Sequence, residues 1–128
     1  MNTICLALRI LALLALIGFL AVGFMFALEP RMFTGQAINS GSALWHGLSL
    51  AFMATVSAIA FMIVWDPRKF WPMLLPLALG KLTSSSVSLY YYSTYGSFFL
   101  LVNGVTDGLI GLIAIAFFIA CWISSKSS

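Results

Sequence analysis

Two ionisable residues, Lys81 and Asp107, lie inside long apolar stretches of this sequence. An ionisable side chain near the middle of a bilayer costs about 2.5–3.5 kcal/mol by insertion scales, so it normally has a partner. Lys81 lies nine residues beyond Pro72 in one stretch, and Asp107 lies nine residues beyond Phe98 in the next. At about 1.5 Å of rise per helical residue, each lies about 13–14 Å from the end of its own helix. In antiparallel helices both depths fall near the midplane of a ~30 Å hydrocarbon core, so we expect an ion pair.

Other polar side chains accompany this pair. We name the set the polar seam, and its members are Lys81, Asp107, Asn103, Ser84, Ser85 and Ser88. The serines follow Lys81 at helical spacing, and Asn103 lies one turn before Asp107. One interpretation, which we favour, is structural: the pair fixes the register of two helices. The other is a site that binds a ligand or carries a proton. Serines also help membrane helices to pack, so both interpretations stay open.

The remaining candidates have simpler interpretations. His46 is expected at the membrane edge, where an imidazole could titrate near neutral pH. Gly104, Gly108 and Gly111 form a small-residue stripe that is expected to pack against another helix, within the same chain in preference to a dimer interface. One histidine and two cysteines offer no metal-ligand spacing, and no GxSxG motif is present. We therefore predict no catalytic residue, no bound metal and no cofactor.

Four apolar stretches must position these residues, at about 10–28, 44–65, 72–92 and 98–123. Each is close to the ~20 residues that a helix needs to cross a bilayer. Short connections favour antiparallel neighbours, so we predict an all-α membrane protein with four transmembrane helices in an up-down-up-down bundle, forming one domain over 1–128. The first stretch also resembles a signal peptide, with a candidate cleavage site at 21–23. Its apolar run exceeds the ~7–15 residues of a signal peptide's core, so we expect it to be retained.

The breaks between the stretches differ in character. Residues 32–42 form a polar, glycine-containing loop, which we expect to be the least rigid segment. Residues 66–69 are expected to form a tight charged turn, and residues 93–97 an uncharged one.

Basic residues predict the orientation in the membrane. One side would carry Arg9, Arg68, Lys69 and Lys126, and the other only Arg31. Loops rich in Lys and Arg stay on the cytoplasmic side, so both termini are expected in the cytoplasm. The expected location is a cell membrane, either plasma or bacterial inner, crossed several times.

Composition narrows the classes of function. Hydrophobic residues make up 62% of the chain and charged residues 7%, whereas soluble domains carry roughly 25% charged residues. The net charge of +3 is too sparse for a nucleic-acid footprint. The expected partners are therefore the lipid bilayer and other membrane subunits or further copies of this chain.

The layout resembles the DoxX-like group of small four-helix membrane proteins. The resemblance lies in a first helix ending at Glu29-Pro30, a polar outer loop and a second helix ending at Asp66-Pro67-Arg68, with Lys81 and Asp107 in the last two helices. It extends over the whole chain as a pattern, without a specific motif, and implies four helices and, for some members, quinone-linked electron transfer. The small multidrug transporters match in length, but they carry a glutamate within their first helix, and this chain has none there.

Three functions follow from these observations as hypotheses, of which a membrane enzyme is the least favoured. The leading one is a small non-enzymatic accessory or assembly subunit of the membrane. The alternative is a small carrier or binder of an amphiphile, a quinone or a proton, built around Lys81 and Asp107.

Overall fold

The structure, a computed structural model, describes residues 2–127, and within this range the chain consists of helices without a strand. The four long helices are α1 (Asn2–Leu28), α3 (Ala43–Trp65), α5 (Leu74–Tyr95) and α6 (Phe98–Ser127). Three short elements connect them, α2 (Arg31–Thr34), α4 (Pro67–Phe70) and the 3-10 helix η1 (Trp71–Met73). The expectation of an all-α fold is confirmed.

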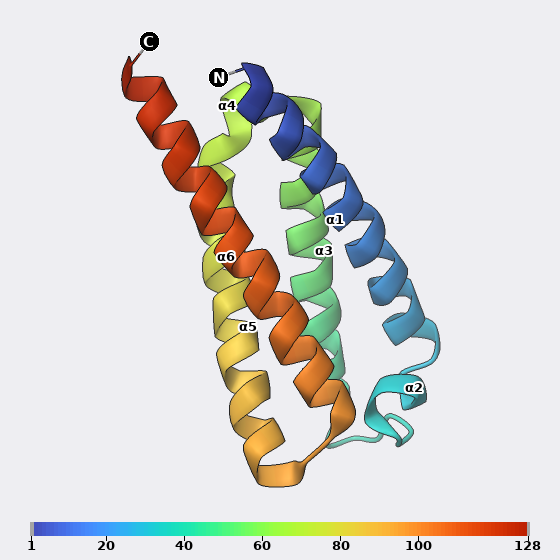
Figure 1. The fold of residues 1–128 in the computed structure, drawn as a ribbon. Helices are drawn as coiled ribbons and strands as arrows, with labels where there is room; N and C mark the ends of the chain where they lie inside the picture. The colour runs from blue at the N-terminus through green and yellow to red at the C-terminus, as the bar shows by residue number, and fades with distance from the viewer. Residues whose placement is uncertain (1, 128) are drawn as a thin grey trace.

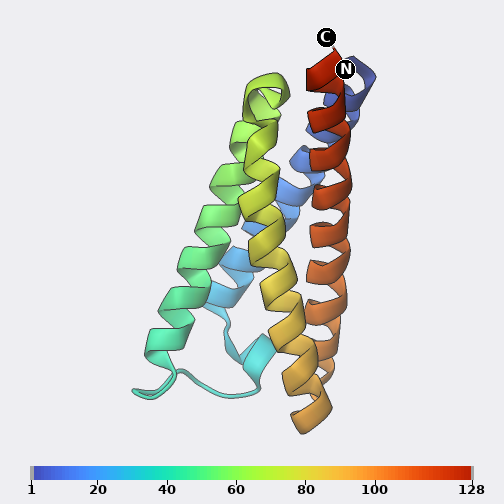
Figure 2. The same cartoon turned by 90° about the vertical axis from the view of Figure 1, so that its left-hand side faces the viewer.

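The long helices alternate in direction, so that both ends of the chain lie at one end of the molecule, beside α4 (Figure 1). The opposite end holds α2 and the turn between α5 and α6. The most extensive packing is between α5 and α6, and the next is between α1 and α3. Between α3 and α5 the contacts are few, and these two helices diverge away from α4 (Figure 2). The molecule is thus two helix pairs joined most closely near α4.

The core lies toward the α4 end. Val56 and Ile63 of α3 and Cys121 of α6 are the largest side chains that are fully buried, and Ala78 of α5 meets them without exposure. Close packing of apolar side chains therefore holds the helices together at this end. Lys81 lies one turn beyond Ala78, so the polar seam begins where the apolar core ends.

Asp66 separates α3 from α4 and explains why the charged turn is helical. Its Oδ1 accepts hydrogen bonds from the backbone N–H groups of Arg68 (3.1 Å) and Lys69 (3.2 Å), as an N-cap residue does. Pro67 follows at the first helical position, where its missing N–H costs nothing. The segment expected to be a simple turn therefore contains α4 and η1, and α5 begins at Leu74 instead of Pro72.

The other helix ends also differ from the apolar runs, because a helix continues until the backbone is interrupted. α1 begins at Asn2 and passes through Arg9, and α6 continues to Ser127. α5 continues to Tyr95 and ends at Gly96, whose φ of 70° is the left-handed conformation that glycine adopts readily. The polar loop overlaps α2, which ends at Thr34 and has Gly35 as its C-cap residue. Its low rigidity stays a prediction.

Three helices, α1, α3 and α6, are long and apolar enough to cross a membrane. Large apolar side chains cover their outer faces, as at Leu14 and Leu112, which are 61% and 62% exposed. Apolar surface of this extent needs a lipid or protein environment. The protein is therefore a helical membrane protein. α5 is not one of these three helices. It is long enough, but Lys81 and a run of serines and tyrosines lower its mean hydropathy.

Candidate functional site

Lys81 and Asp107 form an ion pair between α5 and α6. The Lys81 Nζ lies 3.0 Å from Asp107 Oδ1, and the two side chains are 3% and 8% exposed. The contact that the depths of the two residues predicted is therefore present. Since both side chains are buried, neither presents a charge to the outer surface of the molecule.

Hydrogen bonds extend the pair along the two helices. The Ser84 hydroxyl donates to Asp107 Oδ2 at 2.6 Å, so each carboxylate oxygen has a donor. The Asn103 amide donates to Ser88 Oγ at 2.8 Å and to Ser84 Oγ at 3.4 Å. Within residues 2–127, every buried side-chain nitrogen and oxygen has a hydrogen-bond partner. Five of the six seam residues thus form one connected network, and their buried polar atoms all have hydrogen-bond partners within the described chain.

Ser85, the sixth seam residue, has a different partner. Its hydroxyl donates to the Gly104 carbonyl at 2.6 Å, which ties α5 to the backbone of α6. This side of the seam is a helix contact, and Ser85 does not touch the ion pair through any hydrogen bond of the described chain.

The three stripe glycines lie against α5. An added Cβ would lie 2.7 Å from Leu89 Cδ2 at Gly104, 2.8 Å from Ser85 Oγ at Gly108 and 2.7 Å from Leu82 Cγ at Gly111. These distances are shorter than ordinary van der Waals contact. The absence of side chains at these positions therefore allows α5 and α6 to approach closely, which is how small-residue stripes act in membrane helices.

Two aromatic rings complete the surroundings of Lys81. Its Nζ lies 4.3 Å from the ring centroid of Phe19 in α1 and 5.4 Å from that of Phe52 in α3. Both distances are within the ~6 Å range of a cation–π interaction. The ammonium group of Lys81 in α5 therefore faces a residue from each of the other three long helices. Sequence reasoning missed both rings, because a phenylalanine in an apolar helix carries no signal of its neighbour.

A shallow hollow of about 490 Å³ lies beside the seam, between α3 and α5. Its lining residues are Phe52, Leu79, Gly80, Thr83, Ser84 and Val87. The Phe52 ring packs closely on α5, because a Cβ on Gly80 would lie 2.8 Å from its Cε2. Ser84 belongs both to this hollow and to the hydrogen-bonded network. The hollow is therefore mostly apolar and adjoins the ion pair through Ser84 and Phe52.

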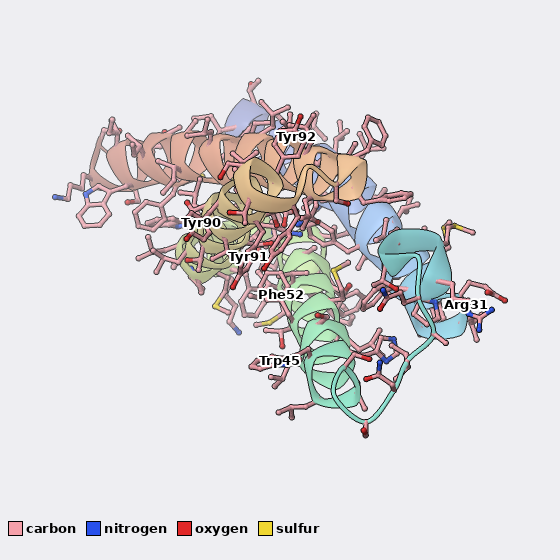
Figure 3. All side chains as sticks on the ribbon, turned by 90° about the horizontal axis from the view of Figure 1, so that it is seen from below. Arg31, Trp45, Phe52, Tyr90, Tyr91 and Tyr92 are labelled. Carbon is pink, nitrogen blue, oxygen red and sulfur yellow. The ribbon has the colours of Figure 1, made fainter. Side chains whose placement is uncertain are left out.

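His46 lies near the α2 end of the molecule, apart from the seam. Its Nε2 is 3.1 Å from the Phe26 carbonyl oxygen, and its ring centroid is 4.9 Å from the Phe26 ring. The histidine thus links the start of α3 to the end of α1. Figure 3 shows this end from below, with Trp45 projecting outward from α3 and with Tyr90 and Tyr91 together at one side of α5.

Among the residues that the structure describes, no group of three or more His, Cys, Asp or Glu side chains is placed to hold a metal ion. No family model, no curated protein and no solved structure matches this chain.

Proposed function

We propose that the chain crosses the cell membrane four times, with α5 as the fourth span and both termini in the cytoplasm. The burial of Lys81 against Asp107 supports a transmembrane α5, because the pair removes the most costly group of this helix from contact with lipid. The hydroxyls of Ser84, Ser85 and Ser86 are all hydrogen-bonded within the described chain, which lowers the cost of the serine run in the same way. The excess of basic residues at the α4 end supports the orientation.

We further propose that the protein is a non-enzymatic accessory or assembly subunit. The observation that carries this proposal is the outward side of α5, which mixes apolar and polar groups. Thr83 and Tyr90 are exposed there beside Leu79 and Val87, next to the hollow. Lipid tails offer a hydroxyl group no hydrogen bond, whereas a helix of another membrane subunit does. This side of α5 is therefore the surface that a partner helix fits best.

Site-specific photo-crosslinking in native membranes tests this proposal. A photoreactive residue replaces Val87 on α5, and the matched control replaces Ile113 on α6. Both side chains are apolar and 48% exposed, so they differ in position and not in accessibility. The expected result is a discrete protein adduct from position 87 and a diffuse lipid background from position 113. An adduct of twice the 13.9 kDa chain identifies the partner as a second copy. Equal patterns at the two positions would contradict the subunit function.

The hollow favours a second candidate function, the binding or transport of an amphiphile. Its apolar lining suits a hydrocarbon chain, and the Ser84 and Thr83 hydroxyls lie where a polar head group could form hydrogen bonds. Phe52 lines the hollow, and its ring centroid lies 5.4 Å from Lys81 Nζ, so the ammonium group lies close to the wall of the hollow.

Native mass spectrometry of the detergent-purified chain separates the two candidates. A carrier retains a small molecule of defined mass, and Thr83→Phe, which adds a ring to the lining of the hollow, should remove it. A subunit retains its protein partner and loses it when the α5 surface is changed. If the chain carries neither after purification in mild detergent, both candidates fail.

A further inference from the structure

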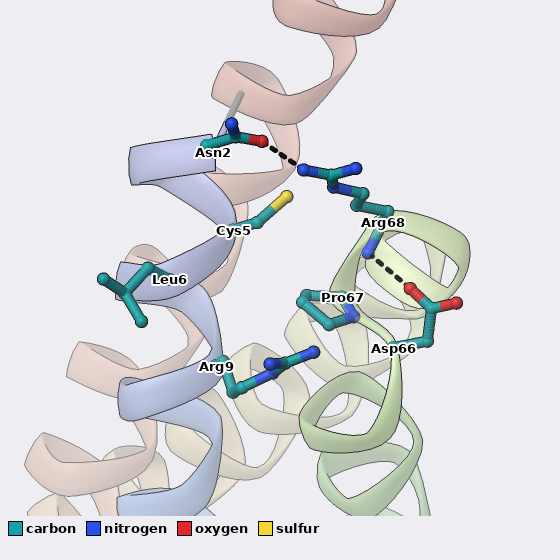
Figure 4. Close-up of a pocket in the computed structure, with 7 residues that line it drawn as sticks. All are labelled: Asn2, Cys5, Leu6, Arg9, Asp66, Pro67 and Arg68. Atoms are coloured by element: carbon teal, nitrogen blue, oxygen red, sulfur yellow. Dashed lines mark hydrogen bonds between the residues drawn. The ribbon is translucent and has the colours of Figure 1, made fainter.

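A second cavity lies at the opposite end of the molecule from α2, where α1 meets α4. It has a volume of about 260 Å³ and is lined by Asn2, Cys5, Leu6, Arg9, Asp66, Pro67 and Arg68. Figure 4 shows Arg68 and Arg9 reaching into it from α4 and α1, with Cys5 and Pro67 between them. We name it the arginine pocket.

Both guanidinium groups in this pocket lack an acidic partner. Arg68 donates to the Asn2 side-chain oxygen, and Arg9 makes a 3.5 Å contact with the Trp65 carbonyl oxygen. Neither arginine forms an ion pair with any residue of the described range, where Lys81 and Asp107 supply the only one. The Asp66 carboxylate also lines the pocket, but its Oδ1 is held by the two N–H groups at the start of α4. Two arginines and one carboxylate leave the pocket with an excess of positive charge.

The surroundings of the pocket match those of a membrane–water interface. Trp65 is 72% exposed next to Asp66, and exposed tryptophans gather at the head-group level of bilayers. Leu6 lines the pocket at 59% exposure, and Ile10 continues the same exposed apolar surface of α1. A molecule with its charged head in the pocket would therefore have an apolar path for its tail along α1.

We propose that the arginine pocket binds the phosphate group of an anionic phospholipid, with its acyl chains lying along α1. A guanidinium group presents paired N–H donors that match the oxygens of a phosphate. A phosphatidylglycerol head group keeps the negative charge of its phosphate, whereas the choline of phosphatidylcholine adds a cation that two arginines repel. This proposal is independent of whether the chain is a subunit or a carrier.

The test measures lipid binding to the purified full chain by native mass spectrometry, with phosphatidylglycerol and phosphatidylcholine of identical acyl chains. We expect retention of phosphatidylglycerol, and weaker binding by about tenfold for Arg9→Gln or Arg68→Gln, the usual effect of losing one charge-assisted hydrogen bond. The matched control is Lys69→Gln, which removes one positive charge from the neighbouring position of α4 but does not line the pocket. It should bind like the parent.

Three results would overturn the proposal. Equal retention of both lipids would show that the pocket does not distinguish their head-group charge. Equal weakening of lipid binding by Lys69→Gln would show a general effect of surface charge. Displacement of the lipid by millimolar inorganic phosphate would assign the pocket to a free anion instead. If Arg68→Gln fails to fold, Arg68→Lys keeps the charge but not the paired donors, and it should weaken binding while melting like the parent. Parent-like binding by Arg68→Lys would contradict paired recognition.

Discussion

The two members of the ion pair are unequally supplied with hydrogen bonds. Asp107 accepts from Lys81 and from Ser84, one donor for each oxygen. Lys81 has three N–H bonds and donates one hydrogen bond within the described chain, while its other side faces Phe19 and Phe52. The rings offer their negative faces, which partly replace the missing acceptors. The charge of Lys81 therefore depends on Asp107 more than the charge of Asp107 depends on Lys81.

We predict that removing either charge alone destabilises the protein. Lys81→Met and Asp107→Leu each strand a buried charge, which typically costs ~3–5 kcal/mol, whereas replacing both partners together is much milder. The yield of folded protein and its melting temperature in detergent should fall for each single variant, more for Asp107→Leu, and should largely recover in the double variant.

The double variant also separates the two interpretations of the seam. If it folds and keeps the crosslink from position 87, the pair serves to hold α5 to α6. If it folds but loses a bound amphiphile, the seam takes part in ligand binding. Single variants that express and melt like the parent would refute the dependence of the two charges on each other.

At the scale of the elements, α5 and α6 pack on each other more extensively than any other two helices, and the glycine stripe sets their separation. An added Cβ at Gly111 would also approach the Leu82 backbone nitrogen at 3.3 Å, and one at Gly104 would approach the Leu89 backbone nitrogen at 3.4 Å. A side chain can rotate away, but the backbone of a packed helix cannot. Gly18 of α1, by contrast, has nothing within 4 Å of an added Cβ.

We predict that Gly111→Ala destabilises the protein by about 1–3 kcal/mol, the usual cost of adding volume to a packed contact. The matched control is Gly18→Ala, the same substitution in an open position of another long helix, and it should not lower stability. Thermal unfolding in detergent, followed by circular dichroism, measures both. A parent-like melting temperature for Gly111→Ala would mean that α5 and α6 can move apart without a loss of stability.

The sequence predicted much of this pairing, for identifiable reasons. Depth in a helix follows from residue counting, so the contact of Lys81 with Asp107 could be predicted without coordinates. The short connection at Gly96 implied that α5 and α6 are antiparallel neighbours. The positions of Phe19 and Phe52 could not be predicted, because most of the eleven phenylalanines of the chain lie in apolar helices and are interchangeable by composition. The short helix α4 had a usable signal, since an aspartate followed by proline favours a helix start.

At the scale of the whole molecule, the two ends differ in charge. Arg9, Arg68 and Lys69 lie at the α4 end, where α6 also ends with Lys126. The α2 end carries Arg31. Loops rich in such basic residues stay on the cytoplasmic side during insertion. The charge difference between the ends is therefore the physical basis of the proposed orientation.

We predict that a reporter enzyme that is active only outside the cytoplasm stays inactive when it is fused after Ser128. The same reporter inserted after Gln36, in the loop beside α2, should be active and serves as the control. Activity of the fusion after Ser128 would reverse the orientation or change the number of spans.

The pairing of α5 with α6 also bears on how the chain is made. During synthesis α5 emerges first, with Lys81 unpaired, and it is less apolar than the other three long helices. Asp107 emerges 26 residues later, together with the glycines that fit α5. Under the four-span proposal, α5 has to wait at the insertion machinery until α6 arrives, and the two enter the lipid as a single hairpin. A chain shortened after Gly96 would then leave α5 on the cytoplasmic side, and quality-control proteases would meet it there.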